Sequence, residues 1–392
     1  MVKVFLRGNK VEQKIHANVA LLLFPWASEA PYIFVSDILK IITPISGNIY
    51  VITGHEERIK YENENVNVLP VKLSVHYAKL KNPLWFSYIW WILKCLLIQL
   101  NMGFNLLKVS RSVDIIIYMA YPFNLLPLII GKICRKKNVE LVIRSKEKHH
   151  NRLLNIFLQI NNILDFRLMD GISPESKSII KDLGLDKYSE KIVGECSRFV
   201  KVDKNVNLKE RKNVVGFIGR LRKEKGIIEF IKSIPIILEK RKDIEFLIVG
   251  DGDLSDWVES EVNAIKKIHN VNIRFLGWVS REDIYDVLSS IKLLVLPTHA
   301  EGLPTIILEA MATGTPILTT NVGGIPDVIV DGKTGYILKN NSPNHISKCV
   351  LDALEDPNLE KIVENSRRIV KKKFTYESAV KRWEKIFKTV LE

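Results

Sequence analysis

The segment from His299 to Pro316 places two glutamates where they could bind a ligand; it reads HAEGLPTIILEAMATGTP. The apolar run that precedes it predicts a buried strand, so Glu301 lies in the loop after that strand. Pro304 suits the first position of a helix, and Glu309 then lies inside this helix. Carboxylates accept hydrogen bonds from hydroxyl groups, whereas the amides at a helix start favour anions. The pattern predicts a ligand with hydroxyls and phosphate; the alternative is two surface glutamates.

A second loop with suitable chemistry reads GRLRKEKG, residues 219–226, between a predicted strand and a predicted helix. Gly219 lets the backbone approach a ligand closely. Arg220 can bind phosphate as a fork and Lys225 as a point charge. Ligands of open α/β sheets bind outside the carboxyl ends of the strands, where this loop falls. A solvated charged loop is the alternative.

Strand-like runs alternate with helical patterns along the chain, which predicts an α/β protein with parallel sheets. A chain of 392 residues is too long for one core, and the charged stretch 200–213 has the composition of a linker. We predict two doubly wound domains: residues 1–199, which the C-terminal helix 376–392 joins, and residues 200–375. The expected strands are 20–24, 49–53, 114–118, 139–143, 214–218, 244–249, 273–275, 293–296 and 316–319. The expected helices include 124–137, 174–183, 227–240, 281–289, one that ends near 268 and one that starts at 304.

Four stretches of the second half resemble the donor half of a family-4 glycosyltransferase. In order, they read FIGRLRKEKG, VGDGD, FLGWVSREDIYDVLSSIKLLVLPTHAEGLPTIILEAMATGTPIL and GGIPDVIVDGKTGYIL, within residues 213–340. Glu301 and Glu309, with Gly-Leu-Pro between them, match the E-x7-E pattern of that family. The resemblance implies the GT-B fold, in which two Rossmann-like domains face each other across a cleft.

The same resemblance implies transfer of a hexose-type sugar from a nucleotide-sugar to a glycan or lipid-linked acceptor. Retention is expected at the anomeric carbon, with the leaving phosphate as base and with no metal or other cofactor. Arg220 and Lys225 would hold the diphosphate, Glu309 the ribose and Glu301 the sugar. The donor-binding residues so implied are Gly219, Arg220, Lys225, Val279 (near the base), Glu301, Gly302, Leu303, Pro304, Thr305 and Glu309.

Two further motifs could form either ligand-binding sites or structural turns. Gly250-Asp251-Gly252-Asp253 looks like a dinucleotide fingerprint or a DxD metal motif, but it lacks the third glycine and opens the second strand–helix unit. We expect a structural turn and no metal site. The glycine pair at 323–324 follows a short strand and predicts a turn before a helix.

The N-terminal half matches the family less well. The stretch after Phe24 lacks the glycine pair that many members carry. His149 or His150, in the loop 144–152, corresponds to the histidine that many members place near the sugar; surface histidines are the alternative. Cations crowd this loop and residues 132–137, which favours an anionic acceptor, a lipid headgroup or simply a soluble face.

Residues 83–98 predict an apolar helix rich in tryptophan, in which Ser87, Lys94 and Asn101 form a thin polar stripe. The helix is expected to be too short to span a bilayer. One interpretation places it in a membrane interface, with Trp85, Trp90 and Trp91 at the headgroups. The other makes it a core helix of the acceptor domain.

The totals limit the remaining classes. The net charge of +14 favours anionic partners, but cations and aromatics are not interleaved as single-stranded nucleic acid binding requires. The four cysteines lack metal or disulfide spacing, and the N-terminus lacks a secretory signal, so we expect a cytoplasmic protein, at most attached to the inner membrane face. A nucleotide-sugar epimerase and a non-catalytic sugar-nucleotide-binding subunit remain the alternatives.

Overall fold

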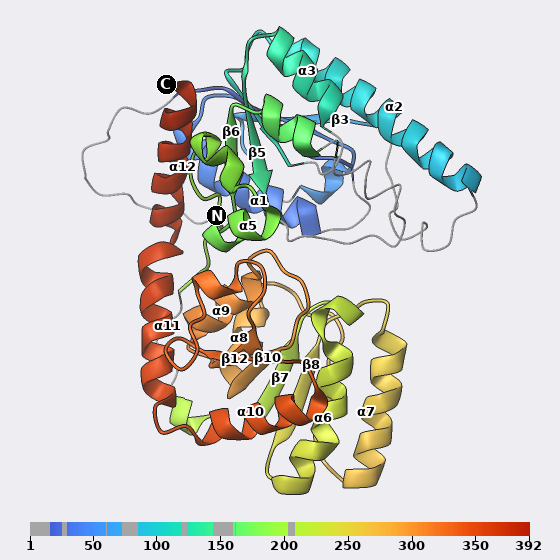
Figure 1. Ribbon diagram of the computed structural model, residues 1–392, viewed down its shortest axis with the longest axis vertical. Coiled ribbons are helices and arrows are strands. Elements are labelled where there is room, and N and C mark those ends of the chain that lie inside the picture. Colours follow the sequence, from blue (N-terminus) through green and yellow to red (C-terminus); the bar gives the residue numbers. More distant parts are fainter. Residues whose placement is uncertain are drawn as a thin grey trace.

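The computed structural model describes residues 16–25, 30–59, 61–72, 85–119, 124–143, 160, 162–202 and 208–392. They form two lobes, one above the other, and the chain builds the upper lobe first (Figure 1). Each lobe contains one six-stranded sheet. In both sheets every neighbouring pair of strands is parallel.

The N-terminal sheet has the strand order β3-β2-β1-β4-β5-β6, and the order reverses between β1 and β4. Its strands are β1 (Val19–Leu22), β2 (Ile49–Thr53), β3 (Val66–Pro70), β4 (Ile115–Tyr118), β5 (Lys137–Val142) and β6 (Gly171–Pro174). Its helices are α1 (Ala30–Ile42), α2 (Trp85–Val109), α3 (Leu125–Ile133) and α5 (Lys177–Leu183).

The C-terminal sheet has the order β12-β11-β10-β7-β8-β9, which repeats the topology of the first sheet with its reversal between β7 and β10. Its strands are β7 (Val214–Ile218), β8 (Glu245–Val249), β9 (Ile273–Phe275), β10 (Leu293–Leu296), β11 (Ile317–Thr320) and β12 (Tyr336–Leu338). Its helices are α6 (Ile227–Lys240), α7 (Ser255–His269), α8 (Ile284–Ser290), α9 (Thr305–Thr313), α10 (Pro343–Glu355) and α11 (Leu359–Lys373). Two Rossmann-like domains are therefore present, as predicted.

The central strands are aliphatic because both faces of a parallel sheet are covered by helices. Every residue of β1, β4, β7, β10 and β11 is buried. These are the strands whose positions the sequence predicts to within one or two residues. The α/β class can therefore be predicted from the alternation of aliphatic runs and helical hydrophobic patterns, without any motif.

The last helix, α12 (Tyr376–Leu391), leaves the lower lobe and lies against the upper one (Figure 1). Its residues Trp383 and Phe387 are completely or almost completely buried in the same hydrophobic core as Ile38 of α1. The core of the lower lobe, by contrast, extends from Val200 to Phe374. The chain thus crosses between the domains twice.

Several elements differ from the predictions. The predicted helix 174–183 starts only at Lys177, because Pro174 is still part of β6. The predicted helix 124–137 stops at Ile133, before Arg135 takes a left-handed backbone (φ 56°). Part of the predicted linker is ordered: Arg211 is buried and donates hydrogen bonds to the carbonyl oxygens of Leu288 and Ile291 at 3.3 and 2.8 Å.

The tryptophan-rich helix is longer than predicted. Helix α2 covers 25 residues, and its stretch Trp90–Val109 is apolar and long enough to cross a bilayer by length and composition alone, so the expectation that it is too short was wrong. Only 39% of the apolar window is buried within the protein. The helix nevertheless contributes to a core, because its own residues Ile98, Met102 and Leu106 are buried in the first domain. One face of the helix is therefore part of a core, as one of the two interpretations predicts, and the other face is exposed.

Candidate active site

The two predicted loops meet at the point where the strand order of the C-terminal sheet reverses. The first loop follows β7 and the second follows β10, and β7 pairs with β10 in the sheet. The ammonium group of Lys225 donates a hydrogen bond to Oε1 of Glu301, and both side chains are almost fully buried. The hydroxyl of Thr298 also donates to Oε1 of Glu301, at 3.3 Å. A crevice at such a reversal is where open α/β sheets bind ligands.

The loop after β7 owes its shape to its last glycine. Gly226 has φ +74°, and a Cβ atom at this position would overlap the carbonyl oxygen of Pro297. The loop is thereby held against the end of β10, which brings Lys225 to Glu301. Gly219 lies at the end of β7, and the side chain of Arg220, the next residue, is exposed. Both cations predicted for phosphate therefore lie on one loop at the reversal point.

Glu309 lies one turn inside α9, and its carboxyl is buried. Burial raises its pKa, and the guanidinium of Arg281, with Nε 3.8 Å from Oε1, opposes that rise. Nη1 of the same guanidinium donates to Oδ1 of Asp37 in α1, at 2.7 Å. Arg281 thus bridges a buried carboxylate of each domain. Pro304 occupies the cap position before α9, one residue earlier than predicted.

A buried glutamate of the first domain touches the loop between the two predicted carboxylates. Glu175, just after β6, accepts a hydrogen bond from the amide of Leu303 at 3.0 Å. Burial raises the pKa of Glu175, while Arg198, at 3.5 Å, opposes the rise. A Cβ atom at Gly302 would lie 2.8 Å from the carboxyl of Glu175. Glycine at 302 therefore permits the two domains to meet here.

The glycine pair at 323–324 packs against the backbone of the same loop, at Glu301 and Gly302. Gly323 has φ +57°, and a Cβ atom there would overlap the carbonyl oxygen of Glu301. The amide of Gly324 donates to the carbonyl oxygen of Gly302 at 2.7 Å. Next to this turn, Asp327 accepts hydrogen bonds from the amide and the hydroxyl of Ser178 in the N-terminal domain. The turn is thus both a support and a domain contact.

The Gly-Asp-Gly-Asp stretch forms the predicted turn. The carboxyl of Asp251 accepts from the amide of Gly252 at 2.7 Å and from the hydroxyl of Ser255 at 2.6 Å. These bonds hold the turn that precedes α7, whose N-cap residue, Leu254, has no side-chain capping bond. Within the residues that the structure describes, no group of three or more His, Cys, Asp or Glu side chains is arranged to hold a metal ion.

The remaining predicted residues are only partly accounted for. His149 and His150 lie outside the described residues. Val279 is half-buried against the lower core, and its neighbour Trp278 is exposed. Leu303 is buried and Thr305 half-buried at the start of α9. Asp37, Glu175, Arg198 and Arg281 were missed by the sequence analysis, since only the folded chain brings them together.

Comparisons with known proteins agree with this geometry. Residues 200–370 match the family model described as glycosyl transferases group 1. The C-terminal half is therefore similar to the glycosyl transferases of group 1. It contains Lys225, Glu301 and Glu309, together with the glycines that shape their loops.

Individual relatives extend the similarity. Over 180 residues the chain is 31% identical to the capsular polysaccharide biosynthesis glycosyltransferase CapM of Staphylococcus aureus. The matched region covers 46% of this chain and 47% of CapM. The chain is also 26% identical over 315 residues to the uncharacterized glycosyltransferase MJ1069 of Methanocaldococcus jannaschii. This match covers 74% of this chain and 78% of MJ1069. The chain spans about half the length of the first curated relatives that it matches.

The fold as a whole has solved counterparts. The crystal structure of HepE from Anabaena in complex with UDP and glucose superposes with a TM-score of 0.72, covering 95% of this chain and all of that one at 16% identity. This likeness shows the architecture, which is the GT-B fold of two Rossmann-like domains.

Proposed function

We propose that the protein is a glycosyltransferase that moves a sugar from a nucleotide-sugar donor to a glycan or lipid-linked acceptor. The observation that carries the proposal is the meeting of Lys225, Glu301 and the start of α9 at the reversal point of the C-terminal sheet. This place offers carboxylates for sugar hydroxyls beside cations and amides for a diphosphate. The family match of this half and the complex of HepE with UDP and glucose support the same conclusion.

The proposed mechanism needs no protein nucleophile. Arg220, Lys225 and the amides before α9 neutralise the diphosphate as its bond to the sugar breaks. They stabilise the transition state more than the bound donor, because the negative charge on the leaving group grows as that bond lengthens. The acceptor hydroxyl attacks from the face that the diphosphate leaves, and a phosphate oxygen takes its proton. The configuration at the anomeric carbon is thereby retained. We further propose that no metal takes part, so 10 mM EDTA should leave turnover unchanged.

Glu301 has a special position in this proposal. Its carboxylate forms an ion pair with Lys225 before a donor binds. The donor must therefore break this ion pair to reach either side chain. When the diphosphate reaches Lys225, Glu301 regains hydrogen-bonding capacity for the sugar hydroxyls. Donor binding then exchanges one charge-assisted bond for several, which favours a complete nucleotide-sugar over a free nucleotide.

The first experiment is a thermal-unfolding screen of the purified protein with UDP, GDP, ADP, TDP and their sugars. A ligand at about 100 times its dissociation constant adds ~2.7 kcal/mol of stability. We expect one nucleotide to raise the midpoint of unfolding, and Glu309→Ala to abolish the shift. Glu259→Ala, a change at an exposed glutamate on α7 outside the proposed site, is the control and should keep it.

The assay for turnover separates the alternatives. Release of nucleotide that depends on an added acceptor supports glycosyl transfer. A changed sugar configuration without acceptor would indicate a nucleotide-sugar epimerase. Binding without turnover under all acceptors would favour a non-catalytic sugar-nucleotide-binding subunit, and no binding at all would contradict the proposed donor site.

A further inference from the structure

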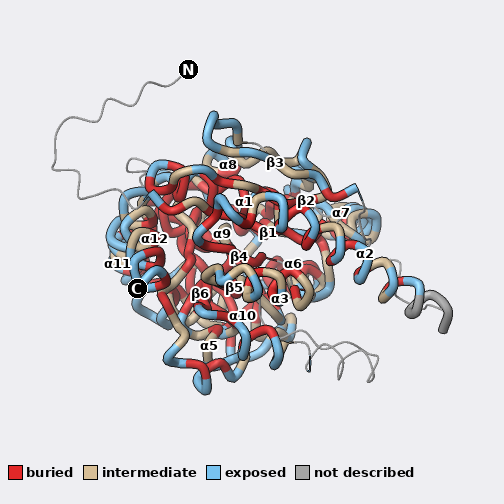
Figure 2. The backbone as a smooth tube through the Cα atoms, turned by 90° about the horizontal axis from the view of Figure 1, so that it is seen from above, coloured by how far each residue is buried: buried red, intermediate tan, exposed pale blue. Residues whose placement is uncertain are grey.

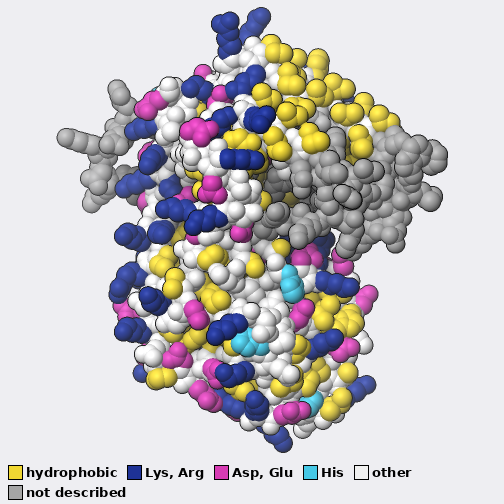
Figure 3. Space-filling model, in the orientation of Figure 1, with side chains coloured by type: hydrophobic (Ala, Val, Ile, Leu, Met, Phe, Trp, Pro, Cys, Tyr) yellow, Lys and Arg dark blue, Asp and Glu magenta, His cyan; other side chains and the backbone are white. Residues whose placement is uncertain are grey.

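Helix α2 presents a continuous row of apolar side chains to solvent. Trp90, Leu93, Leu97, Leu100, Phe104 and Leu107, here called the apolar stripe, are all exposed, Trp90 by 65% and Phe104 by 61%. Their spacing alternates between three and four residues, which keeps them on one side of a helix of 3.6 residues per turn. Figure 3 shows the hydrophobic side chains gathered over α2 and α3 along one edge of the upper lobe.

The opposite side of the same helix belongs to the core. Trp91, Cys95, Ile98, Met102 and Leu106 are buried there. The amide of Leu126 in α3 donates to Oε1 of Gln99 at 3.1 Å, which ties the two helices together. If α2 crossed a bilayer, it would have to leave this core. The helix can therefore lie along a membrane surface but not through it, at the edge of the molecule where Figure 2 shows it.

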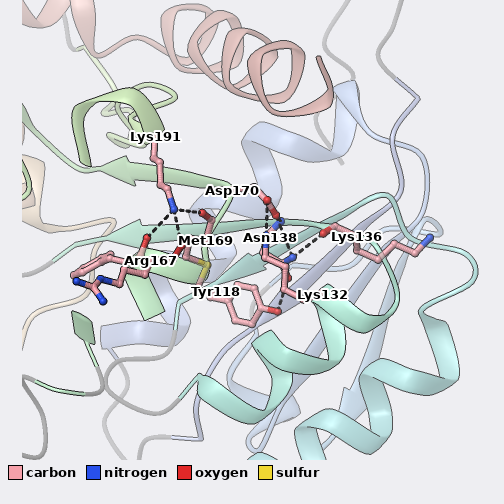
Figure 4. A network of polar contacts seen from close by, with 9 residues as sticks. Tyr118, Lys132, Lys136, Asn138, Arg167, Met169, Asp170 and Lys191 are labelled. Atoms are coloured by element: carbon pink, nitrogen blue, oxygen red, sulfur yellow. Dashed lines mark hydrogen bonds and ion pairs between the residues drawn. The ribbon is translucent and has the colours of Figure 1, made fainter. Parts of the chain in front are cut away.

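The strand–helix unit behind α2 is held by a polar network that runs from the buried Tyr118 to the exposed Asp170 (Figure 4). The hydroxyl of Tyr118 in β4 donates to Oδ1 of Asn138 in β5 at 2.8 Å. The amide of Asn138 donates to Asp170 at 2.8 Å, and Lys132 of α3 pairs with Asp170 at 2.5 Å. The network fixes α3, and α3 supports α2. It also engages the charge of Lys132, which is therefore left out of the cations counted below.

Positive charge borders the apolar stripe. Lys94, Asn101 and Lys108 line one side of it, at intervals of seven residues. Beyond the end of α2 lies the exposed Arg111, and beyond the end of α3 the exposed Arg135. Residues 85–113 and 124–138 contain no aspartate or glutamate. Lys and Arg side chains gather at the upper end of the apolar patch in Figure 3.

We infer that this face docks on the surface of an anionic lipid bilayer, with the apolar stripe in the headgroup–acyl boundary and the cations on the headgroups. Tryptophan at one end of the stripe suits that boundary. A second copy of the chain fits less well. Pairing through the stripe would bring the lysines at 94 and 108 of both copies together, with no acid on the helix to balance them.

The test uses the full chain and sedimentation with vesicles. We expect binding to vesicles of phosphatidylcholine with about 30% phosphatidylglycerol, weaker binding to phosphatidylcholine alone, and loss of binding at high salt. Leu97→Asp with Leu100→Asp should weaken binding at least tenfold. Ile268→Asp, at an apolar residue that is 76% exposed on α7 of the other domain, is the matched control and should bind like the original chain.

A second set of variants tests the charges without touching the stripe. Each of Lys108→Gln, Arg111→Gln and Arg135→Gln should weaken binding to the anionic vesicles about fivefold, the effect of about 1 kcal/mol per cation, and leave binding to neutral vesicles unchanged.

Three results would overturn the inference. The first is no binding to either vesicle. The second is equal loss in Ile268→Asp. The third is a lipid-free dimer that Leu97→Asp with Leu100→Asp converts to a monomer in analytical ultracentrifugation, which would assign the stripe to a second copy.

Discussion

At Glu309, burial and a neighbouring guanidinium act on one carboxyl in opposite directions, and burial wins, so its pKa is raised. Ribose hydroxyls need the ionised form as acceptor. Nucleotide affinity should therefore fall as the pH decreases from neutral through this raised pKa, earlier than an ordinary glutamate would cause. Calorimetric titration of the nucleotide found in the screen, from pH 7.5 to 5, measures this.

The matched variant is Glu309→Gln. It should bind the nucleotide about 1–3 kcal/mol more weakly at pH 7.5, the scale for hydrogen bonds to a charged group. Its affinity should lack the acid-side fall caused by residue 309. An unchanged pH profile in this variant would assign the titration to another group and remove the ribose role of Glu309.

Arg220 and Arg222 stand in the same loop but in different surroundings. Arg220 is exposed at the end of β7, whereas Arg222 lies 3.7 Å from Asp253. Arg220→Ala should lower kcat by roughly 10²-fold with little change in KM, because the leaving-group charge that it meets develops in the transition state. Arg222→Ala is the control and should keep kcat. Steady-state kinetics that show equal losses in both variants would contradict the assignment.

The sequence predicted the strand–loop–helix units of the C-terminal domain but not the contacts at the domain junction. Lys225 and Glu301 belong to two loops of one domain, and Glu309 to the helix after the second loop, so a parallel sheet places all three at the same end of that domain. Glu175 reaches Leu303 across 128 residues and Arg281 reaches Asp37 across 244. Such pairs depend on how two domains face each other, which no local pattern encodes.

Among the elements, the predicted ranges agree with the structure to the residue in five cases. Strands β2, β7, β9 and β10 and helix α6 coincide with their predicted ranges. Strand β3 has no fully buried residue, and β6 reads Gly-Ile-Ser-Pro, so neither shows the expected aliphatic run. The sequence analysis did not name either strand.

The turn at Gly323 offers a test of how tightly the donor loop is supported. Gly323→Ala introduces a side chain in a left-handed backbone and against the carbonyl oxygen of Glu301. We expect a loss of about 2–4 kcal/mol in the free energy of unfolding, together with weaker nucleotide binding. Urea denaturation and calorimetry measure the two effects.

Gly332→Ala separates backbone strain from overlap. Gly332 has φ +66°, and nothing lies within 4 Å of a Cβ atom there. This variant should lose only the 1–2 kcal/mol of a left-handed alanine and should bind nucleotide normally. Equal losses of unfolding free energy and of nucleotide affinity in the two variants would mean that the overlap with the Glu301 loop does not destabilise the protein.

At the scale of the molecule, Arg281 links the two domains through buried Asp37. Among the described residues, Arg281→Met leaves the Asp37 carboxylate with one ion-pair partner, Lys40, at 3.9 Å. Because Arg281 is itself 38% exposed, we expect a loss of about 1–3 kcal/mol rather than the full effect of a buried pair. Chemical denaturation measures it.

A double-mutant cycle isolates this bridge. Asp37→Asn removes one of the two buried charges that Arg281→Met leaves without their arginine partner, the other being Glu309, so the combined variant should recover part of the loss. Arg241→Met removes an arginine of a surface ion-pair cluster and should cost at most about 1 kcal/mol. Additive effects of the Asp37 and Arg281 changes would mean that the two side chains do not stabilise each other.

Because Trp383 and Phe387 complete the core of the upper domain, the order of synthesis matters. The ribosome makes Cys196 of that core, then the whole lower domain, and only then α12. At 5–20 residues per second the gap is roughly 10–40 s. During this time the lower domain can fold while the first-made domain still exposes the apolar surface that α12 will cover. The half of the molecule that is made first is therefore the half that finishes folding last and has the greater need of a chaperone.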